Sequence, residues 1–182
     1  MVRVTHNLAK RKTKLIQEPS LSIAGPLVFQ MLFAKDEPEL KEMYASLLSS
    51  AMDTNDTSAH PSFVSIIQQL TSDEAKILRY LANIHEQWPT ISGGDISLKF
   101  QNWCEDAYVT NIERSDAYLD NFVRLRILNY VIGTEAKYVP EHGDDHGVYS
   151  AKVENTEYSF VELTHFGRQF LTACIENVES NK

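Results

Sequence analysis

Two histidines, His142 and His146, flank a pair of aspartates in the segment EHGDDHG, which has the residue types of a metal site. An i, i+4 pair of histidines can bind zinc when both side chains lie on one face of a helix. Gly143 and Gly147 indicate a loop instead, because glycine favours turns over helices. We therefore predict a solvated turn and no metal ligands here, with a zinc or manganese site as the alternative.

The rest of the sequence offers no arrangement typical of a catalytic centre. Cys174 falls on the apolar face of a predicted helix, and Cys104 has no base near it in the sequence, so neither has the surroundings of an activated nucleophile. No glycine-rich segment matches a phosphate-binding or dinucleotide-binding loop. We predict no catalytic residues, no cofactor and no enzymatic activity.

Basic residues are concentrated at the start of the chain. Residues 1–14 contain five basic side chains and no acidic one, whereas the other 168 residues contain 12 basic and 25 acidic side chains. A cluster of this kind can contact the phosphate backbone of a nucleic acid. Its members are Arg3, Lys10, Arg11, Lys12 and Lys14. The simpler interpretation is a solvated, partly disordered arm over residues 1–19.

A second candidate contact surface is the helix predicted over residues 115–129. It carries Asp116 and Asp120 against Arg124 and Arg126, so its net charge is zero. Helices that read DNA usually present a basic face, because phosphate contacts supply most of the affinity. We therefore favour protein docking or dimerisation for this helix. DNA binding through Arg124 and Arg126 is the alternative.

The elements that must position these residues centre on the segment 38–70, which predicts two amphipathic helices joined by a polar hinge. Apolar residues recur at helical spacing from Leu40 to Met52, and again from Phe63 to Leu70. Asp36 and Glu39 have the spacing of a capping box at the start of the first helix. An apolar helix over 20–34 precedes them. Apolar stripes this wide must be buried against the chain itself or against a partner.

Three segments of this region, ELKEMYASLLSSAMD, HPSFVSIIQQL and TSDEAKILRYL, resemble the core motif of the abortive infection alpha (Abi-alpha) family. The preceding EPSLSIAGPLVFQMLF and the later ELTHFGRQFLTACI also resemble that family. The resemblance implies a role in phage defence or prophage competition, through binding of another macromolecule. Its candidate partner-binding positions are Tyr44, Leu47, Leu48, His60 and Pro61. We expect His60 to cap the following helix or to pack beside Pro61, with a titrating group at the hinge as the alternative.

Residues 71–178 have the element order of a winged helix-turn-helix with an added terminal helix. Thr71 and Glu74 predict a capping box ahead of the first helix. PTISGGDIS predicts a loop, and residues 98–112 favour a helix. Alternating apolar residues around Tyr149 to Val153 and Tyr158 to Phe160 predict a small hairpin that turns at Asn155 and Thr156. The loop EHGDDHG is predicted to join an earlier strand around Tyr138 to this hairpin. The last helix is predicted to begin at Thr164.

These observations predict a mainly α (α+β) fold: a helical bundle over 20–70 and a winged-helix-like domain over 71–182. The chain has 182 residues, 43% of them hydrophobic and 23% charged, a composition typical of globular proteins. We expect a cytoplasmic protein, because its apolar run over 21–34 is too short to span a membrane and its cysteines make no disulfide framework. We also expect it to form a homo-oligomer and to bind an unidentified protein. A winged-helix transcriptional regulator is the alternative.

Overall fold

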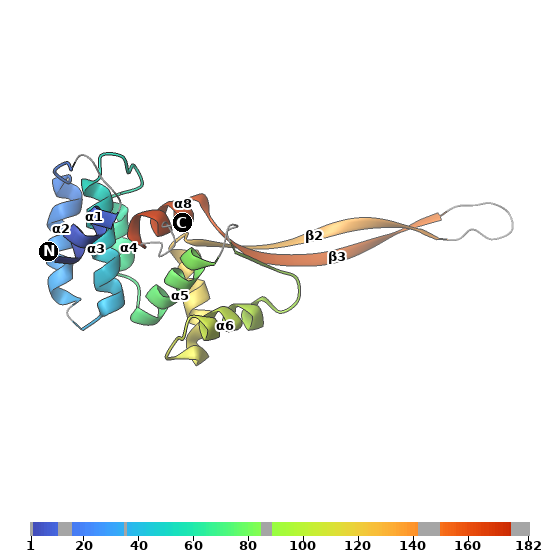
Figure 1. Cartoon of the computed structure of the whole chain (residues 1–182). Helices are drawn as coiled ribbons and strands as arrows, with labels where there is room; N and C mark the ends of the chain where they lie inside the picture. Colours follow the sequence, from blue (N-terminus) through green and yellow to red (C-terminus); the bar gives the residue numbers. More distant parts are fainter. Residues whose placement is uncertain (1, 11–15, 35, 85–88, 142–149, 176–182) are drawn as a thin grey trace.

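The computed structural model describes residues 2–10, 16–34, 36–84, 89–141 and 150–175. Within these ranges the chain forms eight α-helices, one short 3-10 helix and a three-stranded antiparallel sheet (Figure 1). The elements are α1 (Val2–Lys10), α2 (Leu21–Phe33), α3 (Pro38–Met52), α4 (Ser62–Ile67), α5 (Ser72–Asn83), β1 (Thr90–Ser92), α6 (Ile96–Asp106), η1 (Ile112–Arg114), α7 (Ser115–Arg124), β2 (Leu128–Glu141), β3 (Ser150–Leu163) and α8 (His165–Cys174). The fold is therefore mixed α+β and mostly helical. No helix in these ranges is long and apolar enough to cross a membrane.

Helix α3 lies at the centre of the helical end of the molecule, in contact with α1, α2, α4, α5 and α8. Every residue from Met43 to Ala51 is buried, so the helix is enclosed on all sides. Its serines fit this environment because each finds a partner. Ser49 Oγ donates to the carbonyl of Ala45 at 2.8 Å, and Ser50 Oγ donates to the carbonyl of Ala173 in α8 at 2.9 Å. Small side chains with local hydrogen bonds allow the neighbouring helices to approach closely.

Residues 2–10 form a helix, α1, within the region 1–19 that was predicted to be a solvated, partly disordered arm. Val4 and Leu8 of α1 are buried on the same helix face, four residues apart. Asn7 is also buried and donates from Nδ2 to Ser46 Oγ at 3.4 Å. The polar residues between these positions hide the pattern in the sequence, and contact with α3 is what makes the segment helical.

The predicted helices α2 and α3 are present, but the predicted cap of α3 is not. The N-cap of α3 is Glu37, without a side-chain cap bond, so the capping box of Asp36 and Glu39 is wrong. Glu37 instead accepts a hydrogen bond from Ser72 Oγ at 3.3 Å. Pro26 lies inside α2 and not in its first turn, so it removes an intrahelical hydrogen bond there.

The sheet is larger than the sequence predicted. The segment Thr90–Ser92 was expected in a loop, but it forms strand β1. This strand pairs antiparallel with β3, and Ser92 lies opposite Phe160. The sheet order is β1-β3-β2. β2 and β3 are 14 residues long each and pair from end to end, so the hairpin is not small. It projects away from the helices as a two-stranded ribbon (Figure 1).

The predicted turn at Asn155 and Thr156 is wrong, because both residues lie within β3. Asn155 is opposite Ala136, and Thr156 is opposite Glu135. Asparagine and threonine are common in turns, but they are tolerated in an exposed strand when cross-strand pairing continues on both sides. The predicted earlier strand around Tyr138 is present as part of β2. The connection between β2 and β3 falls, as predicted, in the segment that contains the EHGDDHG histidines, and residues 142–149 lie outside the described residues.

The core is continuous between the two predicted units. Phe63 of α4 is fully buried, and its ring centroid lies 5.4 Å from that of Phe166 and 5.2 Å from that of Phe170 in α8. These edge-on aromatic contacts join residues on the two sides of the predicted boundary at Leu70. One hydrophobic cluster extends from α1 to α8. The division into separate domains stays a prediction.

Candidate functional site

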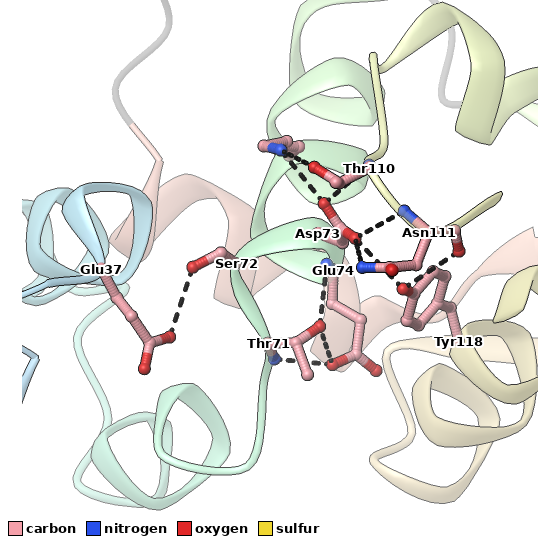
Figure 2. Close-up of polar contacts among 9 residues, drawn as sticks. Glu37, Thr71, Ser72, Asp73, Glu74, Thr110, Asn111 and Tyr118 are labelled. Carbon is pink, nitrogen blue, oxygen red and sulfur yellow. Dashed lines mark hydrogen bonds and ion pairs between the residues drawn. The ribbon is translucent and has the colours of Figure 1, made fainter.

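The start of α5 is fixed by the capping box that the sequence predicts. The Thr71 amide donates to Glu74 Oε2 at 2.7 Å, and the Glu74 amide donates to Thr71 Oγ1 at 3.2 Å (Figure 2). The other oxygen of Glu74 accepts from Asn121 Nδ2 in α7 at 2.6 Å. The same pair of residues therefore begins one helix and holds another against it.

Asp73, inside this first turn, is the centre of a buried polar network (Figure 2). Its carboxylate accepts hydrogen bonds from the amides of Thr110 and Asn111 at 2.9 and 3.0 Å. It also accepts from Asn111 Nδ2 at 3.0 Å and from the Tyr118 hydroxyl at 3.2 Å. Lys76 Nζ donates at 3.0 Å and forms an ion pair with it. Asp73 thus ties the segment before α7, and α7 itself, to α5.

The electrostatics of this network favour an ionised carboxylate. Burial by itself raises the pKa of Asp73. The hydrogen bonds, led by the one from the Thr110 amide, stabilise the charged form more strongly, so the pKa lies well below its ordinary value. Burial and the nearby Asp73 carboxylate raise the pKa of Tyr118 to about 12. A carboxylate saturated with donors positions the backbone and is unsuited to act as a general base.

These contacts orient α7 with one face inward and one face to solvent. Tyr118, Leu119 and Phe122 are buried, whereas Asp116 and Asp120 are exposed. The solvent face of the helix therefore presents Asp116 and Asp120, followed by Arg124 at its C-terminal end. This face thus lacks the excess of positive charge that attracts phosphate groups.

The two arginines predicted as nucleic-acid contacts lie at the C-terminal end of α7. Arg124 donates to Gln69 Oε1 at 3.0 Å and to Asn121 Oδ1 at 2.6 Å, so its guanidinium already has partners within the chain. Arg126 is exposed in the turn before β2, where its backbone has a positive φ of 60°. Its carbonyl accepts from Thr164 Oγ1 at 2.5 Å, which fixes this turn to the start of α8.

The predicted cations of the N-terminal arm lie elsewhere. Arg3 on α1 forms an ion pair with Glu42 of α3 at 3.5 Å, and Glu42 also pairs with Arg79 of α5. These three side chains line a pocket of about 420 Å³ together with His6 and Ser46. Through Glu42, Arg3 thus helps to hold α1 against α3 and α5.

The structure does not test the phosphate contacts predicted for the other basic residues of the arm. Lys10 ends α1, and its side chain lies outside the described residues, as do Arg11, Lys12 and Lys14. The proposed phosphate contacts of these four residues remain predictions.

Comparison with known proteins identifies the family. A family model described as abortive infection alpha matches residues 3–174. This chain belongs to the abortive infection alpha family. The match extends from α1 through the β2–β3 ribbon to α8, and family membership suggests a role in abortive infection, a form of phage defence. Neither the curated proteins nor the solved structures compared with the chain include a significant match.

Three of the residues predicted from the abortive infection alpha motif as partner contacts belong to the interior. Tyr44, Leu47 and Leu48 expose 2, 0 and 9% of their surfaces and pack in the core around α3. Burial, with a smaller effect of the Glu37 charge, raises the pKa of Tyr44 to about 12. In this fold a partner cannot reach these side chains, so their assignment as contacts is corrected to core packing.

The other two motif residues, His60 and Pro61, are exposed at the start of α4. His60 Nδ1 accepts from the Ser62 amide at 3.2 Å and lies 2.7 Å from Ser62 Oγ. Its ring also lies near that of Phe63, with the centroids 5.7 Å apart. The N-cap of α4 is Pro61, without a side-chain cap bond, so His60 contacts the residues that begin the helix but does not occupy the capping position.

The described residues of this abortive infection alpha protein include no metal-like cluster of three or more His, Cys, Asp or Glu side chains. Cys104 and Cys174 are both buried. Burial, with contributions from Asp73 and Glu105, raises the pKa of the Cys104 thiol to about 12. A thiol with this pKa is protonated at neutral pH, whereas a nucleophile must be a thiolate.

Sequence reasoning missed the exposed apolar residues of the ribbon. Tyr130, Ile132, Val153 and Tyr158 expose between 42 and 71% of their surfaces. The Tyr158 ring covers Gly133 on the opposite strand, so closely that a Cβ there would lie 2.3 Å from Tyr158 Cζ. Alternation in the sequence indicated that strands exist in this region. It did not show that both strands continue well beyond the core.

Proposed function

We propose that this protein is a non-enzymatic, macromolecule-binding component of abortive infection that acts through protein–protein contacts. The order of elements from α5 to β3, together with the sheet order β1-β3-β2, supports a winged-helix-like unit. In that interpretation α7 has the place of the recognition helix and the β2–β3 ribbon has the place of the wing. A partner protein would contact the exposed face of α7 and the ribbon.

The observation that carries this proposal is the charge of the surface that a DNA-binding winged helix would place against phosphates. Asp116 and Asp120 occupy the exposed face of α7, and Arg124 is engaged by Gln69 and Asn121. The surface around α7 therefore offers a nucleic acid no excess of cations, which phosphate binding requires.

The β2–β3 ribbon also lacks an excess of positive charge on its exposed surface. Exposed acidic residues Glu135, Glu154 and Glu157 outnumber the exposed Lys137 along its described part. Exposed apolar side chains such as Ile132 lie between them and the core. Apolar and aromatic residues surrounded by polar ones are typical of protein-binding surfaces. We expect the partner to present apolar groups flanked by basic residues.

A charge-reversal experiment in phage-challenged cells tests the proposal. Cells that express the wild-type protein should restrict at least one phage of a broad panel, and Asp116→Lys with Asp120→Lys should abolish that restriction. The matched control reverses two exposed acids of the N-terminal part, Glu18→Lys with Asp36→Lys, and should retain restriction. Both variants should melt like the wild type, because exposed substitutions usually change stability little.

Two results would contradict the proposal. One is equal plating of the whole panel on cells with and without the gene, which would remove the defence role. The other is full restriction by the α7 variant, which would show that this helix is not the contact surface.

A DNA-binding regulator is the second candidate, and the winged element order together with the basic run from Lys10 to Lys14 favours it. Fluorescence anisotropy with mixed-sequence duplex DNA at about 50 and 200 mM salt tests it, because phosphate contacts weaken steeply over this range. Truncation of the arm would remove Val4 and Leu8 from the core. Glutamine substitution of the basic residues between positions 10 and 14 is therefore the better variant.

Three outcomes separate the two functions. Absence of binding by the wild type supports protein docking. Binding that is lost in Arg124→Glu with Arg126→Glu would establish α7 as a DNA reader and overturn our proposal. Binding that is lost only in the glutamine variant would assign DNA contact to the arm and leave α7 free for a protein partner.

A further inference from the structure

Helix α2 has a solvent-exposed apolar face that the other described residues leave uncovered. We define the outer face of α2 by its five large exposed side chains and the glycine between them. Their exposed fractions are 87% for Leu21, 54% for Val28, 58% for Phe29, 71% for Leu32 and 69% for Phe33, and Gly25 is also exposed. The rings of Phe29 and Phe33 pack edge to face, with their centroids 4.9 Å apart.

The spacing of these residues is that of a helix-packing seam. Leu21, Gly25, Val28 and Leu32 follow one another at intervals of four, three and four residues. This pattern places side chains in one line along a helix and is the pattern by which two helices pack together. The inner side of α2 already uses Ile23 and Leu27, which are buried in the bundle. One apolar face of α2 therefore packs in the bundle, and the other is exposed to solvent.

The composition of α2 is that of a helix whose two apolar faces are both buried. None of its 13 residues, LSIAGPLVFQMLF, is charged, although the whole chain has a net charge of −8. A surface helix normally has a polar or charged outer side, and a helix that is apolar all round is normally buried. Isolated exposed apolar residues are common, but a contiguous face of this size marks an interaction site.

The area of the outer face matches what each subunit of a stable dimer contributes. From their exposed fractions, the five large side chains leave roughly 700 Å² accessible, and a standard interface takes about 800 Å² from each partner. The chain itself offers a partner face of the same size. A two-fold symmetric dimer requires a patch that complements itself, and an uncharged apolar seam meets this requirement.

We propose that the outer face of α2 is the interface of a homodimer, in which α2 of one copy packs on α2 of a second copy. The contact desolvates no charged side chain of α2, because the helix has none. The acidic residues that give the chain its negative charge lie on other elements. A nucleic acid would gain nothing from this face, since it offers no cation to a phosphate. The proposal does not depend on the partner surface assigned to α7.

Sedimentation equilibrium tests the dimer with the full chain over about 1 to 100 µM, a range that detects interfaces of ordinary strength. The wild type should have twice the mass of the 20.7 kDa chain. Leu32→Glu with Phe29→Glu should weaken dimerisation at least about 100-fold, because it buries unpaired carboxylates in an apolar contact. Both positions are exposed within one copy, so circular dichroism should show an intact fold.

The ribbon supplies a matched control. Ile132 exposes 71% of its surface, the same fraction as Leu32, but lies on β2. Ile132→Glu should leave the dimer unchanged. A wild-type mass of one chain throughout the concentration range would overturn the proposal, and so would equal dimerisation of the wild type and the Leu32→Glu, Phe29→Glu variant. A dimer that is lost in Ile132→Glu alone would place the interface on the ribbon and also overturn it.

Lipid is the other apolar occupant that such a face could accept, and flotation with phosphatidylglycerol-containing vesicles separates the two. A dimer that does not float supports the proposal. A monomeric wild type that floats, together with a Leu32→Glu, Phe29→Glu variant that does not, would assign the face to a membrane surface and refute the homodimer.

Discussion

The replacement of Asp73 by asparagine tests whether the buried carboxylate holds α7 in place. Asparagine has nearly the same shape, but one carboxylate oxygen becomes an NH2 group and the negative charge is lost. If the nitrogen takes the position of Oδ1, it faces the Thr110 amide and the Lys76 ammonium, which both donate to that oxygen. If it takes the position of Oδ2, it faces three other donors, two of them on Asn111.

The magnitude follows from the number of donors that lose their acceptor. In the first orientation the Thr110 amide loses its acceptor, while Lys76 keeps Thr110 Oγ1. In the second, both Asn111 donors lose theirs, while the Tyr118 hydroxyl keeps the Asn111 carbonyl. Each buried unsatisfied group costs about 1–3 kcal/mol, and the lost charge weakens the remaining contacts. We therefore expect the free energy of unfolding to fall by about 3 kcal/mol. For a chain of this size, that corresponds to a decrease in melting temperature of roughly 6–12 °C.

The effect should depend on pH with a definite sign. The pKa of Asp73 is lower in the folded protein than in the unfolded chain, where an aspartate titrates near 3.9. Its contribution to stability is therefore complete above about pH 5 and is lost as the pH falls below 4. The asparagine that replaces it in the variant does not titrate, so the stability difference between wild type and variant should shrink on acidification.

Urea unfolding monitored by circular dichroism at pH 7, 5 and 3 measures this difference. Asp120→Asn is the matched control, because Asp120 is exposed on α7, and it should change stability by less than about 0.5 kcal/mol. A loss below about 1 kcal/mol at pH 7 in Asp73→Asn would refute the structural role of the network. A difference that is the same at pH 7 and pH 3 would show that the charge is not its cause.

Three further predictions concern packing and reactivity. Leu47→Asp should cost at least about 3 kcal/mol in urea unfolding because it buries a charge at a fully buried position, whereas Leu98→Asp, at a position 56% exposed, should cost little. Gly167→Ala should destabilise the protein by about 1–3 kcal/mol, because its Cβ would lie 2.1 Å from a backbone carbonyl oxygen. Gly25→Ala meets no atom within one copy of the chain and should stabilise α2 within that copy by about 0.5–1 kcal/mol. Cys104, with its pKa raised to about 12, should resist iodoacetamide at pH 8 until urea unfolds the chain; labelling of the native protein at the rate of a free thiol would contradict its burial.

Local signals in the sequence correctly indicated most of the helices. The apolar spacing in α3, α4 and α7 reports a face that must be buried, and this depends on residues within a few turns of one another. The capping box of Thr71 and Glu74 is equally local, and it is present. The similar pattern at Asp36 and Glu39 failed because Glu37 takes the N-cap position and bonds Ser72 of another helix.

The length of the hairpin and the helical state of the arm depended on distant residues. Asn155 and Thr156 have the local character of a turn, but pairing with β2 on both sides keeps them in a strand. Val4 and Leu8 give too few apolar positions to predict a helix without the surface of α3. In both places the tertiary contact outweighs the local preference.

The sequence by itself determined where most of the helices form and which of their faces are apolar, because helix periodicity and end capping act over a few residues. The tertiary structure decided what covers those faces: it placed Tyr44, Leu47 and Leu48 inside and left Phe29 and Leu32 of α2 exposed. It also gave Asp73 donors that lie 37 to 45 residues further along the chain. Such partners are selected by the packing of whole elements, which no local pattern of residues records.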